Sequence, residues 1–193
     1  MTSLITPDAL EVTELHAEIT RGITDQRERM VALWYWVATQ VKYHKFVKAR
    51  IEVGGKVSYQ SDFWSPPTLT IGTKVGNCAV KSFLLASLLR NELPPSQVHC
   101  VLGNLYNGTA GGHCWVELNI GENVIMESTR SDIPAFIPVE GTTRYEAVHY
   151  FNDQDVYVIE GRTVLKPMTA CYSTWLTEYL DWAYIKANRE RGI

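Results

Sequence analysis

The sequence has little charge and no long apolar run, and both features narrow the classes of protein to consider. Charged residues make up 20% of the 193 residues, and the net charge at pH 7 is −3. The chain therefore lacks the basic excess that nucleic-acid binding needs, and we interpret the short basic run at 42–50 as a solvated helix end. No apolar stretch approaches the ~18 residues of a membrane span. We expect a protein that binds neither nucleic acid nor membranes.

The N-terminal segment MTSLITPDALEV also lacks the basic segment and apolar run of a secretory signal, so we expect a cytoplasmic protein. The length and the 46% of hydrophobic residues fit one domain, residues 1–193. No C-x-x-C pair occurs, and disulfides are rare in the cytosol. We therefore expect thiols rather than disulfides at the four cysteines, which are Cys78, Cys100, Cys114 and Cys171.

A metal site is the alternative that the pairs His99-Cys100 and His113-Cys114 raise. Neighbouring residues on a strand point to opposite faces, so each pair offers one ligand. Zinc prefers four ligands with tighter local spacing. The sequence therefore favours chemistry without a metal, and we expect no cofactor.

Helical signals dominate the first half of the sequence. Pro66-Pro67 and two glycines argue against regular structure in the long segment 61–77. Before it, the pattern predicts a helix at 8–21, a helix that begins at the capping box of Asp25 and Glu28, and a hairpin at 51–59. After it, a helix is predicted from Cys78 to Asn91. The apolar face of this last helix consists of Val80, Phe83, Leu84 and Leu88.

The second half of the sequence changes to the period of strands. Strands are predicted at 97–104, 113–120, 123–129, 145–151 and 155–160, and a last helix at 173–188. Helices followed by a mainly antiparallel sheet predict an α+β fold.

Cys78 stands where a loop becomes a helix, in KVGNCAVKSFLLASLLR. The first turn of a helix has N–H groups without intrahelical partners and the positive end of the helix dipole. Both favour the thiolate, which is the nucleophilic form of cysteine. The same N–H groups suit an oxyanion. Cys78 is therefore a candidate nucleophile, although a small buried residue at a helix start would give the same pattern.

A base is supplied by His113 in GGHCWVELNI. Strand alternation places His113 and Trp115 on one face and the apolar Cys114 and Val116 on the other. We expect His113 at the start of its strand, beside a Gly111-Gly112 loop, accessible and titrating near neutral pH.

The third group of a catalytic triad would orient the histidine, and Glu127 is the candidate. A symmetric hairpin centred on Glu122 pairs Glu127 with Glu117, on the face of His113 but short of it. Contact with His113 then needs a staggered register or a bulge. Asp132 is the reserve acid.

Three segments together, GNCAVKSFLLASLLR, GGHCWVEL and VIMESTR, resemble the signature of the transglutaminase-like, papain-fold cysteine enzymes. In that superfamily a G-[DN]-C opens the core helix, an H-x-W-V-E-type strand carries the base, and an apolar-D-x-T strand carries the acid. The stretch DFWSPPTLTIGTKVGNC resembles the approach to the cysteine in bacterial members. The resemblance covers about residues 25–130, and it selects Glu127 as the acid where the family usually has aspartate.

The resemblance implies a transglutaminase-like core, with 131–193 completing the sheet and adding a helix. It implies acyl transfer from a peptide or protein amide through a thioester on Cys78, with hydrolysis by a cysteine peptidase or amidase favoured. A protein-glutamine transglutaminase or deamidase is one alternative, and a catalytically silent binding module is another. Trp64, Asn77 and Trp115 are candidate site-lining groups, and a tryptophan or amide N–H would complete an oxyanion hole; core packing is the competing interpretation for both tryptophans.

Overall fold

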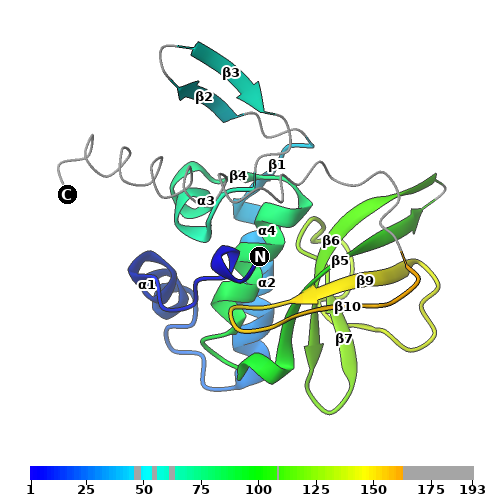
Figure 1. The fold of residues 1–193 in the computed structure, drawn as a ribbon. Helices are drawn as coiled ribbons and strands as arrows, with labels where there is room; N and C mark the ends of the chain where they lie inside the picture. The colour runs from blue at the N-terminus through cyan, green and yellow to red at the C-terminus, as the bar shows by residue number, and fades with distance from the viewer. Residues whose placement is uncertain (46–48, 54–55, 61–63, 108, 163–193) are drawn as a thin grey trace.

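A computed structural model describes residues 1–162 apart from 46–48, 54–55, 61–63 and 108 (Figure 1). The helices are η1 (Thr2–Leu4), α1 (Leu10–Ile19), α2 (Gln26–Gln40), α3 (Pro67–Thr73), α4 (Cys78–Leu89) and η2 (Pro95–Gln97). The strands are β1 (Lys42–Tyr43), β2 (Ala49–Val53), β3 (Lys56–Gln60), β4 (Val75–Gly76), β5 (Val98–Asn107), β6 (Thr109–Asn119), β7 (Asn123–Met126), β8 (Ile137–Pro138), β9 (Tyr145–Phe151) and β10 (Val156–Val158).

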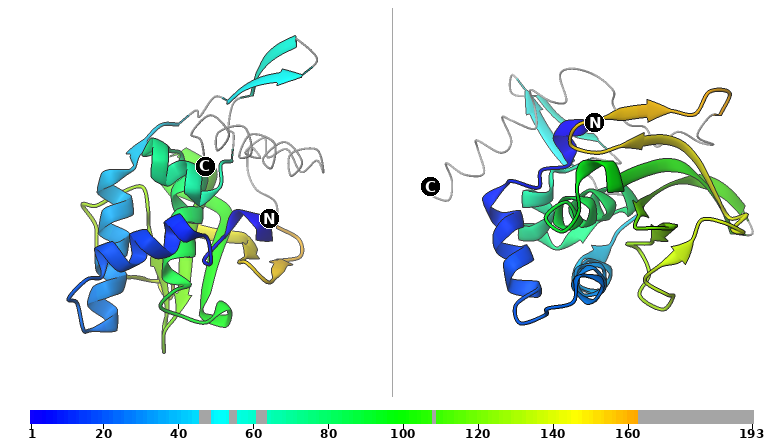
Figure 2. Two further views of the ribbon diagram at one scale, coloured as in Figure 1. Left: turned by 90° about the vertical axis from the view of Figure 1, so that its left-hand side faces the viewer. Right: turned by 90° about the horizontal axis from the view of Figure 1, so that it is seen from below.

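The main sheet is antiparallel throughout and has the strand order β10-β9-β5-β6-β7-β8. Helices α1, α2 and α4 lie to one side of it, as the view from below in Figure 2 shows. The predicted α+β class is confirmed. Strands β8, β9 and β10, all after residue 130, belong to this sheet.

Helix α4 is the centre of the molecule, and all twelve of its residues are buried. It contacts α1, α2 and α3 as well as β5 and β6. The prediction of a single apolar face was therefore incomplete. Serines tolerate this burial because their hydroxyls find carbonyl acceptors: Ser82 Oγ donates to the Cys114 carbonyl at 3.1 Å, and Ser87 Oγ to the Phe83 carbonyl at 2.8 Å.

Helix α3 corrects the prediction that 61–77 is irregular. Proline is compatible with the first turn of a helix, where its missing N–H is not needed. Pro66 is the N-cap and Pro67 the first residue of α3, and Lys74 ends the helix in the left-handed conformation with φ of 52°. The two prolines therefore start a short helix rather than prevent one.

A short parallel pair of strands holds the segment that leads into α4. Lys42 of β1 lies opposite Val75 of β4, and the Lys42 N–H donates to the Lys74 carbonyl at 2.8 Å. Gly76 passes so close to the next turn that a Cβ there would lie 3.0 Å from Cγ1 of Val80. The end of α2 thus sets the position at which α4 begins.

Strands β5 and β6 form a hairpin that is longer than predicted. Gly111 and Gly112 were expected in a loop, but they lie in β6, opposite Leu105 and Asn104. The polar and glycine-rich sequence hid this extension, because strand pairing here depends on the backbone rather than on apolar alternation.

The remaining predicted elements have mixed outcomes. Strands β9 and β10 confirm the predictions at 145–151 and 155–160, and β2 with β3 confirms the hairpin at 51–59. The capping box is confirmed, since the Asp25 side chain accepts from the Glu28 N–H at 2.8 Å. The predicted helix at 173–188 lies outside the described residues.

Candidate active site

Cys78 is the first residue of α4, and its neighbour Asn77 caps the helix. The Asn77 side chain accepts from the Val80 N–H at 3.1 Å. A good capping residue is therefore present, and Cys78, which is 7% exposed, takes the next position. The first turn of a twelve-residue helix places partial positive charge at this thiol.

His113 reaches Cys78 from the middle of β6, and the two side chains share a hydrogen bond. The histidine is only 8% exposed, so the prediction of an accessible histidine at a strand start was wrong. Aromatic rings cover it: Trp115 stacks on its ring with centroids 6.1 Å apart, and Tyr145 lies 6.4 Å from it. Bulk water is therefore largely excluded from the imidazole.

Glu127 completes the group, with Oε2 lying 2.7 Å from Nε2 of His113. Its other oxygen, Oε1, accepts from the Thr129 N–H at 2.9 Å and from the Thr129 hydroxyl at 2.6 Å. Glu127 is 1% exposed. A buried carboxylate with this many donors stays ionised and holds the imidazole in one orientation.

The register of the β6–β7 hairpin explains how Glu127 reaches His113. The prediction centred the hairpin on Glu122, but Glu117 lies opposite Ile125 and Asn119 opposite Asn123. The turn is thus centred one residue earlier, on Gly121, and Glu127 emerges two residues nearer to His113 along β6 than the symmetric model placed it. The staggered register that contact required is present.

Asp132, the reserve acid, does not join this group. It forms an ion pair with Arg130 at 2.7 Å, and its side chain is 69% exposed. Glu127 is therefore the carboxylate that contacts His113.

The charges of the group favour a protonated histidine. Burial acts to lower the pKa of His113, but hydrogen bonds with Cys78 and Glu127 and the charges of both raise that pKa well above its ordinary value. Burial acts to raise the pKa of Glu127, yet the hydrogen bond and charge of His113, followed by the bonds from Thr129, lower it. The geometry therefore suits a protonated imidazole that lies between the Cys78 side chain and an ionised carboxylate.

Of the three candidate site-lining groups, Asn77 and Trp115 lie at the site, whereas Trp64 packs in the core. Asn77 is at the site as the cap of α4. Trp115 is fully buried, contacts His113, and donates from Nε1 to Glu117 at 2.8 Å. Trp64 packs edge-to-face on Phe83 in the core, with centroids 5.3 Å apart. Its buried Nε1 has no hydrogen-bond partner within the part of the chain that the structure describes.

Three side chains near the triad were not identified from the sequence. The Tyr145 hydroxyl donates to Oε2 of Glu127 at 3.2 Å, and the Trp34 indole N–H donates to the Glu127 carbonyl at 2.7 Å. Lys81 is buried, and its ammonium donates to the carbonyls of Ala38 and Val41 at 3.1 and 2.7 Å. The residues around them in the sequence form no motif that identifies them, because each side chain contacts a segment that is distant in sequence.

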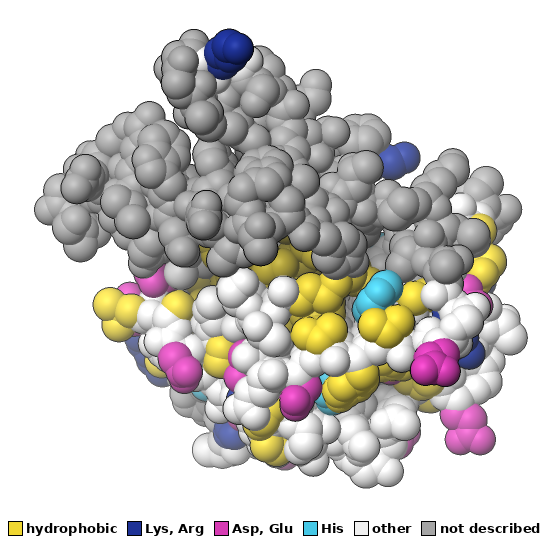
Figure 3. Space-filling view, in the orientation of Figure 1, with side chains coloured by type: hydrophobic (Ala, Val, Ile, Leu, Met, Phe, Trp, Pro, Cys, Tyr) yellow, Lys and Arg dark blue, Asp and Glu magenta, His cyan; other side chains and the backbone are white. Residues whose placement is uncertain are grey.

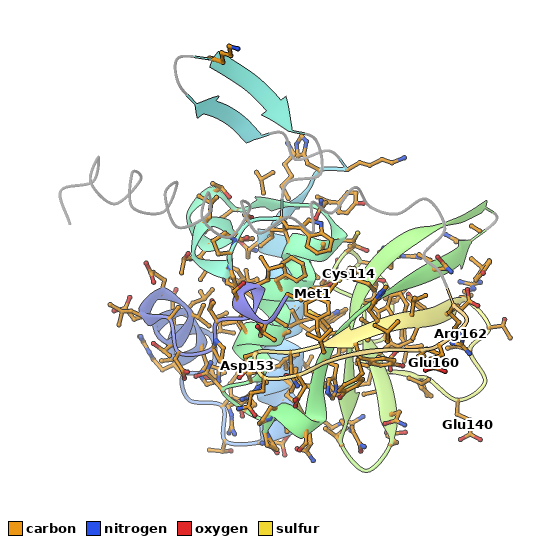
Figure 4. The ribbon with its side chains drawn as sticks, viewed as in Figure 1. Met1, Cys114, Glu140, Asp153, Glu160 and Arg162 are labelled. Atoms are coloured by element: carbon orange, nitrogen blue, oxygen red, sulfur yellow. The ribbon has the colours of Figure 1, made fainter. Side chains whose placement is uncertain are left out.

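The cysteines and histidines of the two His-Cys pairs lie in different surroundings. Cys100 and Cys114 are fully buried, and Cys114 of β6 is labelled beside α4 in Figure 4. His99 is hydrogen-bonded to the Tyr157 hydroxyl. Within the described ranges, no group of three or more His, Cys, Asp and Glu side chains is arranged to hold a metal ion.

None of Cys78, Cys100 and Cys114 is in a disulfide, whereas Cys171 lies outside the described residues.

On the face shown in Figure 3, apolar side chains gather across the middle, and acidic and basic ones are scattered around them. Of the helices in the described part of the chain, none combines the length and the apolar character that crossing a bilayer requires.

Comparisons with known proteins bear on the family and the fold of this chain. The sequence profile of the transglutaminase-like superfamily matches residues 13–127, which is more than half of the chain. Calcium-bound LapG of Legionella pneumophila has a similar fold, with a TM-score of 0.50 and 14% identity over 93% of this chain and 99% of that one. A candidate cysteine protease from Cytophaga hutchinsonii gives a TM-score of 0.49 and 15% identity over 86% of this chain and 55% of that one. Among curated proteins, no significant match was found.

Proposed function

The chain belongs to the transglutaminase-like superfamily, which confirms the resemblance of its three sequence segments, and from that premise we propose that it is a cysteine enzyme that cleaves amide bonds. The observation that carries the proposal is the contact of Cys78, His113 and Glu127 at the start of α4. This is the constellation that activates a thiol for nucleophilic catalysis.

In the proposed reaction, the Cys78 thiolate attacks the carbonyl carbon of a peptide or protein amide. The tetrahedral intermediate collapses when the His113 imidazolium protonates the leaving amine, and a thioester on Cys78 remains. His113 is then neutral and removes a proton from the acceptor, which attacks the thioester. Breakdown of the second intermediate returns the thiolate and the imidazolium.

The oxyanion of each intermediate needs hydrogen-bond donors. The amino end of α4 lies at the attacking sulfur, and its backbone N–H groups are the first candidates. Trp64 is the second candidate, because its buried Nε1 lacks a partner among the described residues. An unpaired buried donor is costly in the resting protein, and an oxyanion would satisfy it.

We propose water as the acceptor, so that the enzyme is a hydrolase of the peptidase or amidase type. Cys78 and His113 are only 7% and 8% exposed, and a small acceptor reaches such a pair without a second binding groove. The silent binding module is disfavoured, because a buried histidine–carboxylate pair costs desolvation energy that a non-catalytic fold has no need to offset.

Trapping of the acyl-enzyme tests the proposal. Incubation with a panel of peptides and glutamine-containing proteins, followed by intact-mass measurement, should show an acyl adduct on the wild type and on Cys100→Ala, whose thiol is fully buried outside the site. Cys78→Ala should show none. Release of the acyl group by water supports hydrolysis. If only an added amine releases it, the reaction is transamidation rather than hydrolysis.

Alkylation gives a second reading that needs no substrate. At about pH 6 an ordinary thiol is almost fully protonated, whereas a thiolate–imidazolium pair reacts. Iodoacetamide should therefore label Cys78 before Cys100, Cys114 and Cys171. Uniform slow labelling, or retained amide cleavage in Cys78→Ala, would refute the proposed chemistry.

A further inference from the structure

We infer that Tyr145 is a positioning residue for the catalytic pair: its hydroxyl holds the Glu127 oxygen that binds His113, and its ring covers the imidazole. The inference rests on the proposed function and extends the site to a strand outside the part of the chain that matches the superfamily profile, residues 13–127.

The hydrogen bonds of the Glu127 carboxylate lead to this inference. Oε1 is held by two donors, both from Thr129. Oε2 binds His113 at 2.7 Å and accepts from the Tyr145 hydroxyl at 3.2 Å. Glutamate has one more rotatable bond than the aspartate that the family usually has here, so the carboxylate needs more anchoring to present one oxygen steadily. Tyr145 supplies the anchor on the side that faces the histidine.

The ring of Tyr145 acts on the same pair. It lies tilted 6.4 Å from the His113 ring and edge-on to Trp115 with centroids 5.1 Å apart. The histidine is thus flanked by two aromatic rings, which limit its rotation and exclude water from its bond with Glu127. A drier environment strengthens that charge-assisted bond.

Tyr145 remains a donor at every pH at which the enzyme would work. Burial, followed by the charge of Glu127 and its hydrogen bond, raises the pKa of Tyr145 well above that of an ordinary phenol. The hydroxyl therefore stays protonated beside the carboxylate and does not add a second negative charge.

A bulge in β9 places this tyrosine. Leu102 of β5 lies opposite His149, but the next residue, Gly103, lies opposite Ala147. The extra residue reverses the alternation of β9 at this point. Tyr145 and Tyr150 consequently pack on the same side of the sheet, against the cluster that contains Trp115.

That arrangement provides a matched control. Tyr150 is on the same strand and is similarly half-buried, and its hydroxyl donates to a carboxylate oxygen of Glu117 at 3.1 Å. Tyr145→Phe and Tyr150→Phe therefore each remove one hydroxyl–carboxylate bond and keep the ring. Only Tyr145→Phe removes a hydrogen bond from the carboxylate that contacts His113.

The experiment measures the rate of Cys78 alkylation by iodoacetamide as a function of pH, with the melting temperature of each variant as a check on folding. Tyr145→Phe should lower the rate in the mildly acidic range by about 3- to 10-fold, and Tyr150→Phe should leave it unchanged. The acid limb of the profile should move to higher pH in Tyr145→Phe, because a carboxylate with one donor fewer binds a proton more readily.

A double-mutant cycle separates positioning from simple packing. In the Glu127→Gln background, Tyr145→Phe should have little further effect on the rate, since the bond that it removes no longer orients the pair. Additive losses, or a lower melting temperature with an unmoved acid limb, would overturn the inference. Cys78 that is not activated even in the wild type would instead refute the proposed function, so the two failures are distinguishable.

Discussion

Replacing Glu127 by glutamine removes one buried negative charge beside His113 and keeps the length of the side chain. The two Thr129 donors still bind the carbonyl oxygen of the new amide, so the NH₂ group turns toward the histidine. An N–H donor facing Nε2 favours a neutral imidazole that accepts there. The imidazolium that stabilises the Cys78 thiolate is therefore lost.

The magnitude follows from the 2.7 Å contact between Oε2 and Nε2. With charge centres about 4 Å apart and an effective dielectric constant of about 20, the attraction is roughly 4 kcal/mol, or about three factors of ten. Glu127 is 1% exposed, so screening by solvent is small. The amide retains a hydrogen bond, and the alkylation rate of Cys78 at about pH 6 should fall by between ~10- and ~1000-fold.

The assay compares wild type, Glu127→Gln and the control Glu117→Gln by the mass of iodoacetamide adducts over time. Glu117 is a half-buried carboxylate that binds Trp115 and Tyr150 but no histidine. The loss should be specific to Glu127→Gln and should shrink at about pH 9, where an ordinary thiol ionises without help. An unchanged rate in Glu127→Gln at about pH 6 would refute the assignment of Glu127 as the triad acid.

Two further predictions concern stability. A Cβ at Gly103 would lie 2.1 Å from the Glu146 carbonyl oxygen and 2.6 Å from the Trp115 ring, so Gly103→Ala should destabilise the protein by about 3 kcal/mol or more. A Cβ at Gly111 would meet no atom within 4 Å, so Gly111→Ala should not destabilise it. Equal melting temperatures of the two variants would contradict this prediction. Burial lowers the pKa of Lys81 to about 8, and the charge of Glu127 opposes this with a smaller effect. Between pH ~8 and ~10.5 the unfolded chain therefore binds more protons than the folded protein. The free energy of unfolding should rise with pH over this range by up to roughly 3 kcal/mol. Urea unfolding should show this rise in the wild type and its absence in Lys81→Met, and parallel pH profiles of the two would contradict it.

The sequence predicted the parts of the site that depend on local interactions. A cap and a first turn involve residues within four positions, so the start of α4 at Cys78 could be identified from GNC alone. Alternation along a strand placed His113 and Trp115 on one face. The order of the three segments then pointed to Glu127, although the pairing prediction placed it too far from the histidine.

Contacts between distant segments decided the rest. Whether the turn after β6 is centred on Glu122 or one residue earlier is a difference of strand register, and register depends on what the neighbouring strands bury. The complete burial of α4 likewise needs α1, α2, α3 and the sheet around it, so its sequence alone predicted only one apolar face.

The sequence by itself thus identified the candidate catalytic groups, because residue type and helix or strand period are properties of short segments. The tertiary structure decided how close these groups come, how dry they are and which side chains support them. Tyr145 shows the difference: it is far from Glu127 in sequence and on a strand that does not pair with β7, and only the folded sheet with its bulge brings its hydroxyl to the carboxylate.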